Sequence, residues 1–156
     1  MQGALSWFFI ALLAVALGAA AVGDWRTRTI PNWLNGTIAL LAIPFWWSVG
    51  LGLWPGVALQ IGLGVAVFAL FAVAFRFGAM GGGDVKMAAA LALWLPFAGV
   101  VKLLVIMSIA GGVLTVAMLA AHRLARSAGQ PEIPYGIAIA FGGFWLIGER
   151  FLNQFV

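Results

Sequence analysis

Charged residues divide this chain into a few long uncharged stretches. No Asp, Glu, Lys or Arg occurs in residues 1–23 or 29–75, and shorter uncharged runs cover 87–101, 103–121 and 133–148. A helix that spans a bilayer needs about 20 consecutive apolar residues, so the run 29–75 is long enough for two. We therefore predict six helices, with approximate ranges 3–22, 36–53, 56–77, 85–98, 100–121 and 135–154.

Proline and glycine mark where some of these segments meet. Trp54-Pro55-Gly56 predicts a turn between the second and third helices, and Pro96 is expected to end the fourth, which is short for a span. The six segments take up most of the 156 residues, so the loops must be short. We predict an all-α, polytopic membrane protein, with residues 1–156 forming a single membrane-embedded domain.

The composition supports this class of protein. Hydrophobic residues make up 65% of the chain and charged residues only 8%, whereas a typical globular protein has about 25% charged residues. So few charges exclude a soluble enzyme, a disordered chain and a nucleic-acid-binding protein. The chain has no cysteine and one histidine, so we expect neither a metal site nor another cofactor.

The basic residues predict the orientation in the membrane. The loops after the first, third and fifth predicted helices share one side and hold six of the eight positive charges. These are Arg26, Arg28, Arg76, Lys86, Arg123 and Arg126, whereas Lys102 and Arg150 fall towards the other side. Cytoplasmic loops carry an excess of Lys and Arg, so the first side is expected to be cytoplasmic and the N-terminus to lie outside.

Two of the four acidic residues occupy unusual positions. Asp24 lies just past the predicted end of the first helix, and Asp84 follows three glycines at the start of the fourth. Ionisable groups at membrane depth are costly and are commonly functional. The structural alternatives are a solvated loop charge for Asp24 and a helix cap for Asp84. The glycines at 81–83 favour a functional role, because they allow another backbone to approach the acid closely.

Three local patterns carry a resemblance to a known family. Asp24 is followed by Ile30-Pro31-Asn32, then come Gly81-Gly82-Gly83-Asp84-Val85-Lys86 and Ile133-Pro134-Tyr135-Gly136. In this order, each at a cytoplasmic helix start or loop, they resemble the type IV prepilin peptidases of the GxGD group of intramembrane aspartyl proteases. The cysteine-containing N-terminal domain of the long form is absent here. The chain therefore resembles the short form of tight-adherence (Flp-type) pilus systems, and no N-methylation activity is carried over.

The resemblance implies an activity and a location. It implies an aspartyl endopeptidase of the bacterial inner membrane that removes a short basic leader from prepilins at the cytoplasmic face. The expected partners are a prepilin with an apolar helix and the lipid bilayer, while the oligomeric state stays open. Asp24 and Asp84 correspond to the catalytic acids. The other motif residues would bind substrate or shape the site, namely Gly81, Gly82, Gly83, Lys86, Pro31, Asn32, Pro134, Tyr135 and Gly136.

Two carboxylates can hydrolyse a peptide bond if they lie close together. Held about 3 Å apart they share one proton, so that the ionised acid activates a water and the protonated acid donates to the scissile carbonyl oxygen. This requires the first and fourth helices to pack together at the cytoplasmic end. Neither aspartate is assigned a fixed role from the sequence.

The neighbouring motif residues have structural interpretations as well. Asn32 is expected to cap the second helix, and Pro134 and Tyr135 are expected to open the last one, with the Tyr135 hydroxyl as a possible donor into the site. Lys86 is either part of the site or an interfacial cation that reaches lipid phosphate. Glu132 is expected to be a solvated loop carboxylate.

Other functions stay open at this point. In an ion- or proton-coupled transporter, Asp24 and Asp84 would be cation sites, which predicts carboxylates near the bilayer midplane, broken helices and often an internal repeat. A structural subunit of a secretion machine would leave both acids without a role. A presenilin-type GxGD protease would carry Pro-Ala-Leu near the last active-site helix, where this chain has Ile-Pro-Tyr-Gly.

Overall fold

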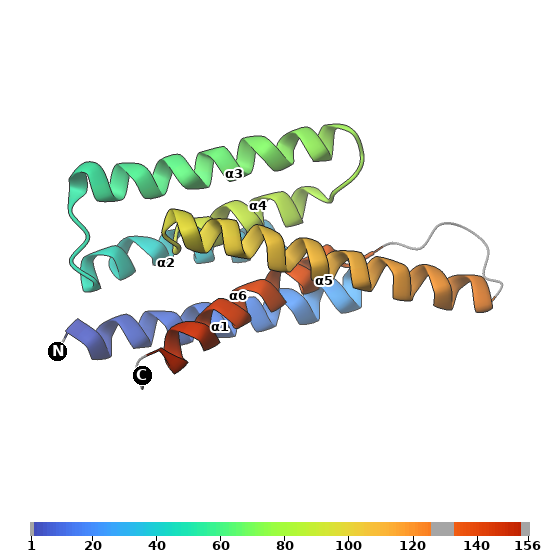
Figure 1. The fold of residues 1–156 in the computed structure, drawn as a ribbon, viewed down its shortest axis with the longest axis horizontal. Coiled ribbons are helices and arrows are strands. Elements are labelled where there is room, and N and C mark those ends of the chain that lie inside the picture. The colour runs from blue at the N-terminus through green and yellow to red at the C-terminus, as the bar shows by residue number, and fades with distance from the viewer. Residues whose placement is uncertain (1, 126–132, 154–156) are drawn as a thin grey trace.

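The computed structural model describes residues 2–125 and 133–153, and this part of the chain forms a bundle of helices without strands (Figure 1). The predicted fold class and the six helices are confirmed. The helices are α1 (Gln2–Thr27), α2 (Asn32–Ser48), α3 (Ala58–Arg76), α4 (Gly82–Ala92), α5 (Phe97–Leu124) and α6 (Tyr135–Leu152). They run up and down along the long axis, so the α1–α2 and α3–α4 connections lie at the same end of the bundle.

The first helix is longer than predicted, and this changes the place of Asp24. The expected end was residue 22, but α1 continues to Thr27. The Thr27 hydroxyl donates to the Gly23 carbonyl at 2.9 Å, and Arg28 N–H donates to the Asp24 carbonyl at 3.0 Å. Arg28 then takes a left-handed φ of 54°, which ends the helix. Asp24 therefore lies in the last turn of α1 and not in the loop after it.

The second helix and the turn that follows also differ from the predicted ranges. The expected range was 36–53, but α2 begins at Asn32, directly after Pro31 with its extended φ of −65° and ψ of 143°. The short segment η1 (Leu53–Val57) precedes α3, and Trp54 inside it has extended backbone angles of −128° and 129°. The predicted turn at Trp54-Pro55-Gly56 is confirmed.

The fourth helix starts and ends earlier than the predicted range of 85–98. Its last residue is Ala92, four positions before Pro96. The chain tightens there, because Trp94 N–H donates to the Leu91 carbonyl and Leu95 N–H donates to the Ala92 carbonyl. Pro96 disfavours helical geometry at the residue before it and itself precedes α5.

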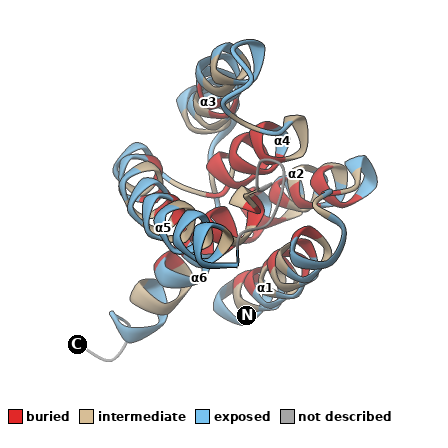
Figure 2. Ribbon diagram, turned by 90° about the vertical axis from the view of Figure 1, so that its right-hand side faces the viewer, coloured by how far each residue is buried: buried red, intermediate tan, exposed pale blue. Residues whose placement is uncertain are grey.

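Three helical stretches in the described part of the chain are long and apolar enough to cross a membrane. They are Gly3–Thr27, Leu53–Arg76 and Phe97–Leu124. Helices α2, α4 and α6 have 17, 11 and 18 residues. At 1.5 Å per residue α4 is about 17 Å long, roughly half of a bilayer's hydrocarbon core. Figure 2 shows that α4 is mostly buried and is surrounded by the other helices, so its surroundings are largely protein.

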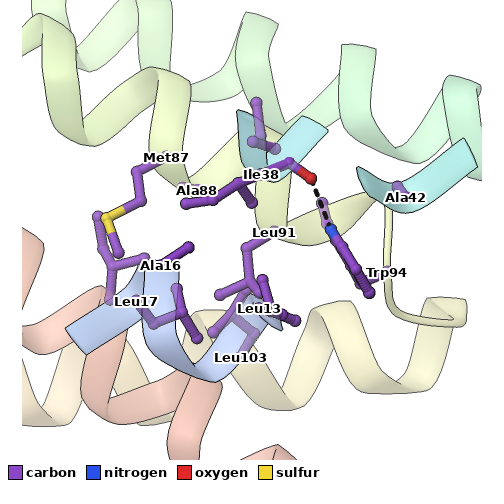
Figure 3. Close-up of a cluster of buried hydrophobic side chains, with 14 of the residues drawn as sticks. Leu13, Ala16, Leu17, Ile38, Ala42, Met87, Ala88, Leu91, Trp94 and Leu103 are labelled. Atoms are coloured by element: carbon purple, nitrogen blue, oxygen red, sulfur yellow. Dashed lines mark hydrogen bonds between the residues drawn. The ribbon is translucent and has the colours of Figure 1, made fainter. Parts of the chain in front are cut away.

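The core forms where α4 meets its neighbours. Met87, Ala88 and Leu91 of α4 pack in one hydrophobic cluster with Leu17 of α1 and Ile38 of α2 (Figure 3). Small side chains on α4 allow this close approach, and they are Ala88, Ala89, Ala90 and Ala92.

Two tryptophans link α2 to the far end of α4. Trp94 Nε1–H donates to the Ile38 carbonyl at 2.9 Å, which Figure 3 marks, and Trp46 Nε1–H donates to the Leu93 carbonyl at 2.8 Å. Both rings are buried. Buried main-chain carbonyls gain partners in this way, and the short helix α4 is fixed in position against α2.

The end of the bundle away from Asp24 carries its own charged groups. Lys102 of α5 forms an ion pair with Glu149 of α6. The guanidinium of Arg150 lies 5.9 Å from the centre of the Trp7 ring and 5.4 Å from that of Phe45. Adjacent residues of α6 thus contact different helices, and both contacts hold α6 in the bundle.

Candidate active site

The two aspartates singled out in the sequence lie at the same end of the bundle and close to each other. Asp24 comes from the last turn of α1 and Asp84 from the first turn of α4. Their exposed fractions are only 4% and 9%, and the charge of Asp24 acts on Asp84. Oδ2 of Asp24 and Oδ1 of Asp84 are buried without a hydrogen-bond partner. The two acids thus lie near each other at one end of the bundle, while their role as a catalytic pair stays a prediction.

Ile30 is the residue that brings the three motifs into contact. A Cβ at Gly83, directly before Asp84, would lie 3.2 Å from Ile30 Cβ. A Cβ at Gly136 would lie 2.6 Å from Ile30 Cδ1 and 2.8 Å from Asp24 Oδ2. A side chain at Gly136 would therefore displace Ile30 or Asp24, and one at Gly83 would press tightly on Ile30. The loop after α1 therefore packs directly on the starts of α4 and α6.

The start of α4 shapes the Asp84 carboxylate. Gly81 precedes the helix in extended conformation, and Asp84 is the third residue of the helix rather than its N-cap. The Gly81 N–H lies close enough to the Asp84 carboxylate to act on its charge, and a Cβ at Gly81 would lie 2.8 Å from Asp84 Oδ2. The carboxylate therefore folds back over its own helix start, as the third-position acid of a capping box does, while Oδ1 stays unpaired.

The start of α6 places backbone amides close to Asp24. The backbone N–H groups of Gly136 and Ile137 lie close enough to its carboxylate to act on its charge, and the Ile137 N–H also donates to the Pro134 carbonyl at 3.2 Å. Both belong to the first turn of α6, whose amides have no partner within the helix and carry partial positive charge. The Asp24 side chain thus connects α1 to the beginning of α6. The sequence predicted a role for Gly136, whereas the contribution of Ile137 comes from its backbone and leaves no sequence signal.

The start of α2 is joined to the start of α4 by two hydrogen bonds. Lys86 Nζ donates to Asn32 Oδ1 at 2.7 Å, and Asn35 Nδ2 donates to the Gly83 carbonyl at 3.1 Å. The expectation that Asn32 caps α2 is wrong, because Pro31 occupies the cap position and no side chain caps the helix. The oxygen of Asn32 instead accepts from Lys86. Asn35 was not predicted, because its partner is 48 positions away in the sequence.

A comparison with known families gives this arrangement a context. A profile of the type IV leader peptidase family matches residues 11–116, more than half of the chain. The chain belongs to this family. Both aspartates and the first two motifs lie inside the matched region, whereas the Ile-Pro-Tyr-Gly motif lies beyond it. Neither a search of curated proteins nor one of solved structures gave a significant match. The chain is thus a membrane protein of a leader peptidase family.

In this leader peptidase the third motif opens α6 as predicted. Pro134 is fully buried and precedes the helix, and Tyr135 is its first residue. The Tyr135 ring packs on α5, since a Cβ at Gly111 would lie 2.9 Å from its Cε1, and its hydroxyl is 3.3 Å from Thr115 Oγ1. The hydroxyl is therefore paired with α5 and not with either aspartate. Glu132 lies outside the described residues.

Arg28 also lies at the candidate site, although the sequence did not single it out. Its Nη1 is buried without a hydrogen-bond partner, its guanidinium lies 5.5 Å from the centre of the Trp25 ring, and its charge acts on Asp24. The left-handed φ of Arg28 is uncommon for a residue other than glycine. The only sequence signal was a basic residue four positions after Asp24, which is also the pattern of an ordinary cytoplasmic loop.

The remaining glycine of the second motif borders α3. A Cβ at Gly82 would lie 3.4 Å from Cε2 of Phe75, an ordinary contact distance.

Among the residues that the structure describes, no three His, Cys, Asp or Glu side chains come together in a way that would hold a metal ion. The polar groups gathered at this end of the bundle include the two carboxylates, main-chain amides, the Arg28 guanidinium and the Lys86 ammonium.

Proposed function

We propose that this chain is an aspartyl endopeptidase that cleaves the short basic leader of type IV, Flp-type prepilins at the cytoplasmic face of the bacterial inner membrane. The observation that carries the proposal is the buried carboxylate pair. Asp24 and Asp84 come from two helices, meet at one end of the bundle and each keep an oxygen without a partner. The membership in a leader peptidase family supports the same conclusion.

In the proposed reaction the two carboxylates share one proton, because two buried like charges at short range are not both ionised cheaply. Asp24 has the better-stabilised anion, since the Gly136 and Ile137 amides and the Arg28 charge are close to it. It takes a proton from the attacking water. Asp84, whose charged form is disfavoured by burial and by the charge of Asp24, gives its proton to the carbonyl oxygen of the scissile bond.

The position of the pair also suits this reaction better than ion transport. A transport site is expected near the middle of the bilayer, with helices broken around it. Here the two acids lie in the last turn of α1 and the first turn of α4, at the end of the bundle that also carries Arg26, Arg76 and Lys86. Water and an unfolded leader peptide can reach a site at that depth.

Co-expression with a prepilin precursor tests the proposal. Asp24→Asn and Asp84→Asn each keep the shape of the side chain and remove its ability to ionise. We expect each variant to abolish the mobility shift of the precursor while the variant protein stays in the membrane fraction. Glu149→Gln, at the opposite end of the bundle, is the control and should process normally. Wild-type processing by either aspartate variant would exclude the carboxylate pair as the catalytic group.

A further inference from the structure

A groove lies between α2, α3 and α4, and neither aspartate is part of its lining. It has a volume of about 690 Å³, and we call it the lateral groove. Its lining includes Asn35, Gly36 and Leu40 of α2, Val65 of α3, and Lys86 and Ala90 of α4. Most of the lining is apolar, and only one end carries polar side chains.

The polar end of the lateral groove lies at the start of α4, the helix turn that also carries Asp84. Lys86 follows Asp84 by two residues and hydrogen-bonds to Asn32, which also lines the groove. Asn35 donates to the carbonyl of Gly83, the residue directly before Asp84. A chain segment that crosses the start of α4 from the carboxylate pair would meet this groove at its polar end. The change from a polar mouth to apolar walls matches a peptide that passes from water into the membrane.

Asn35 provides an independent indication that the groove binds a ligand. The residue is 4% exposed, and its amide nitrogen is used by Gly83. Its Oδ1 is buried and has no hydrogen-bond partner. A buried acceptor without a partner destabilises the protein, so a donor is expected there in the functional complex. A main-chain N–H of a bound peptide is a donor of the right kind.

We propose that the lateral groove binds the apolar helix of the substrate, and that Asn35 Oδ1 accepts a main-chain N–H where this helix gives way to the extended scissile segment. The inference rests on the proposed function. The small side chains of Gly36 and Ala90 allow the backbone of a second helix to approach closely, which is how helices associate in lipid. The leader then extends past the carboxylate pair towards the cytoplasm.

A second groove offers a matched comparison. It has a volume of about 650 Å³, lies between α5 and α6, and is lined by apolar residues such as Ile109, Val113 and Phe141. Its lining contains no Asn, no charged side chain and no unpaired buried acceptor. Its surface suits lipid chains. The lateral groove is therefore the one with the chemistry to position a peptide.

Filling the lateral groove separates binding of the helix from cleavage. A Cβ at Gly36 meets no atom within 4 Å, so Gly36→Phe places its ring in the groove without a clash at Cβ. We expect processing of the full precursor to fall at least tenfold. Cleavage of a short peptide that contains the leader but lacks the apolar helix should stay within twofold of wild type. Gly112→Phe, on α5, is equally open and lines neither groove, so it should leave both reactions unchanged.

The outcomes of this comparison are distinct. Normal processing of the full precursor by Gly36→Phe overturns the docking proposal. Failure of the wild-type protein to cleave either substrate contradicts the proposed function instead. If Gly36→Phe cleaves neither the full precursor nor the short peptide, the substitution has damaged the site itself. The docking proposal is then tested by cross-linking, which does not require activity.

Cross-linking identifies the occupant directly. A photoreactive benzoylphenylalanine replaces Leu40 in the lateral groove or Ile109 in the second groove, each in the Asp84→Asn background with the precursor co-expressed. We expect a precursor adduct from position 40 and none from position 109. A precursor adduct from position 109 alone would show that the precursor does not bind in the lateral groove. An adduct from position 40 with lipid alone, or with a second copy of this chain alone, would show that the lateral groove has another occupant.

Discussion

At the scale of single residues, Gly136 shows how little space the site leaves for an added side chain. A methyl group there would lie 2.6 Å from Ile30 Cδ1 and 2.8 Å from Asp24 Oδ2. We expect Gly136→Ala to keep the fold and to lower the cleavage rate at least tenfold, about 1.4 kcal/mol in the activation barrier, because the new methyl group displaces the Asp24 carboxylate. The measurement is the rate of precursor processing at equal amounts of membrane-inserted protein.

A second glycine of α6 is the matched control for this prediction. Gly148 lies in the same helix, and a Cβ there meets no atom within 4 Å. Gly148→Ala should therefore process the precursor as the wild type does. Equal rates for the two alanine variants would show that the contact between Gly136 and Asp24 does not matter for catalysis.

The sequence identified the acids of the site but not their partners. Asp24 and Asp84 stood out because acidic residues are rare in this chain and both are next to glycine. Arg28 and Asn35 have ordinary neighbours in the sequence. Only the folded chain brings them to the site. The left-handed backbone of Arg28 places it there, and Asn35 is placed by its hydrogen bond to the Gly83 carbonyl, 48 positions away. Asn32 was assigned to a cap, and its real partner, Lys86, is 54 positions away.

At the scale of helices, the tryptophan hydrogen bonds explain how a helix as short as α4 is held in place. Trp94 Nε1–H donates to the Ile38 carbonyl at 2.9 Å, and the ring is 4% exposed. Trp94→Phe keeps an aromatic ring and removes the donor. We expect it to destabilise the protein by about 1–2 kcal/mol, as for other buried hydrogen bonds. The measurement is thermal unfolding in lipid nanodiscs, and cleavage well below the transition should persist.

The control for this prediction is another tryptophan near the same end of α2. Trp47 is 85% exposed, so its ring faces the surroundings of the bundle. Trp47→Phe should leave the unfolding temperature unchanged. An equal loss of stability in both variants would mean that the size of the ring, and not the bond to Ile38, is what matters at Trp94.

The existence of the helices was predictable, whereas their ends were not. Uncharged runs locate apolar segments well, because each charge is costly within lipid. The ends depend on local hydrogen bonds that these runs do not record. Thr27 and Arg28 set the end of α1, and the turn around Trp94 sets the end of α4. The error at α1 is the important one, since it moved Asp24 from a loop into a helix turn.

At the scale of the whole molecule, the charges are distributed unequally between the two ends of the bundle. Within the described residues, the end with the carboxylate pair carries Arg26, Arg28, Arg76, Lys86 and Arg123. The other end carries Lys102 and Arg150, and Lys102 is paired with Glu149. The sequence predicted this asymmetry. The short helix α4, which carries Asp84 and Lys86, lies enclosed by the other helices.

This asymmetry predicts the orientation in the membrane, and the absence of native cysteine makes it directly testable. Thr29→Cys places an exposed thiol beside the carboxylate pair, and Leu53→Cys places one at the opposite end, where the side chain is 84% exposed. The excess of positive charge should keep the first end in the cytoplasm. In intact spheroplasts a membrane-impermeant maleimide should label position 53 alone, and permeabilisation should make position 29 reactive. The reverse pattern would put the carboxylates outside the cell, on the wrong side of the membrane for a leader that has not yet been exported.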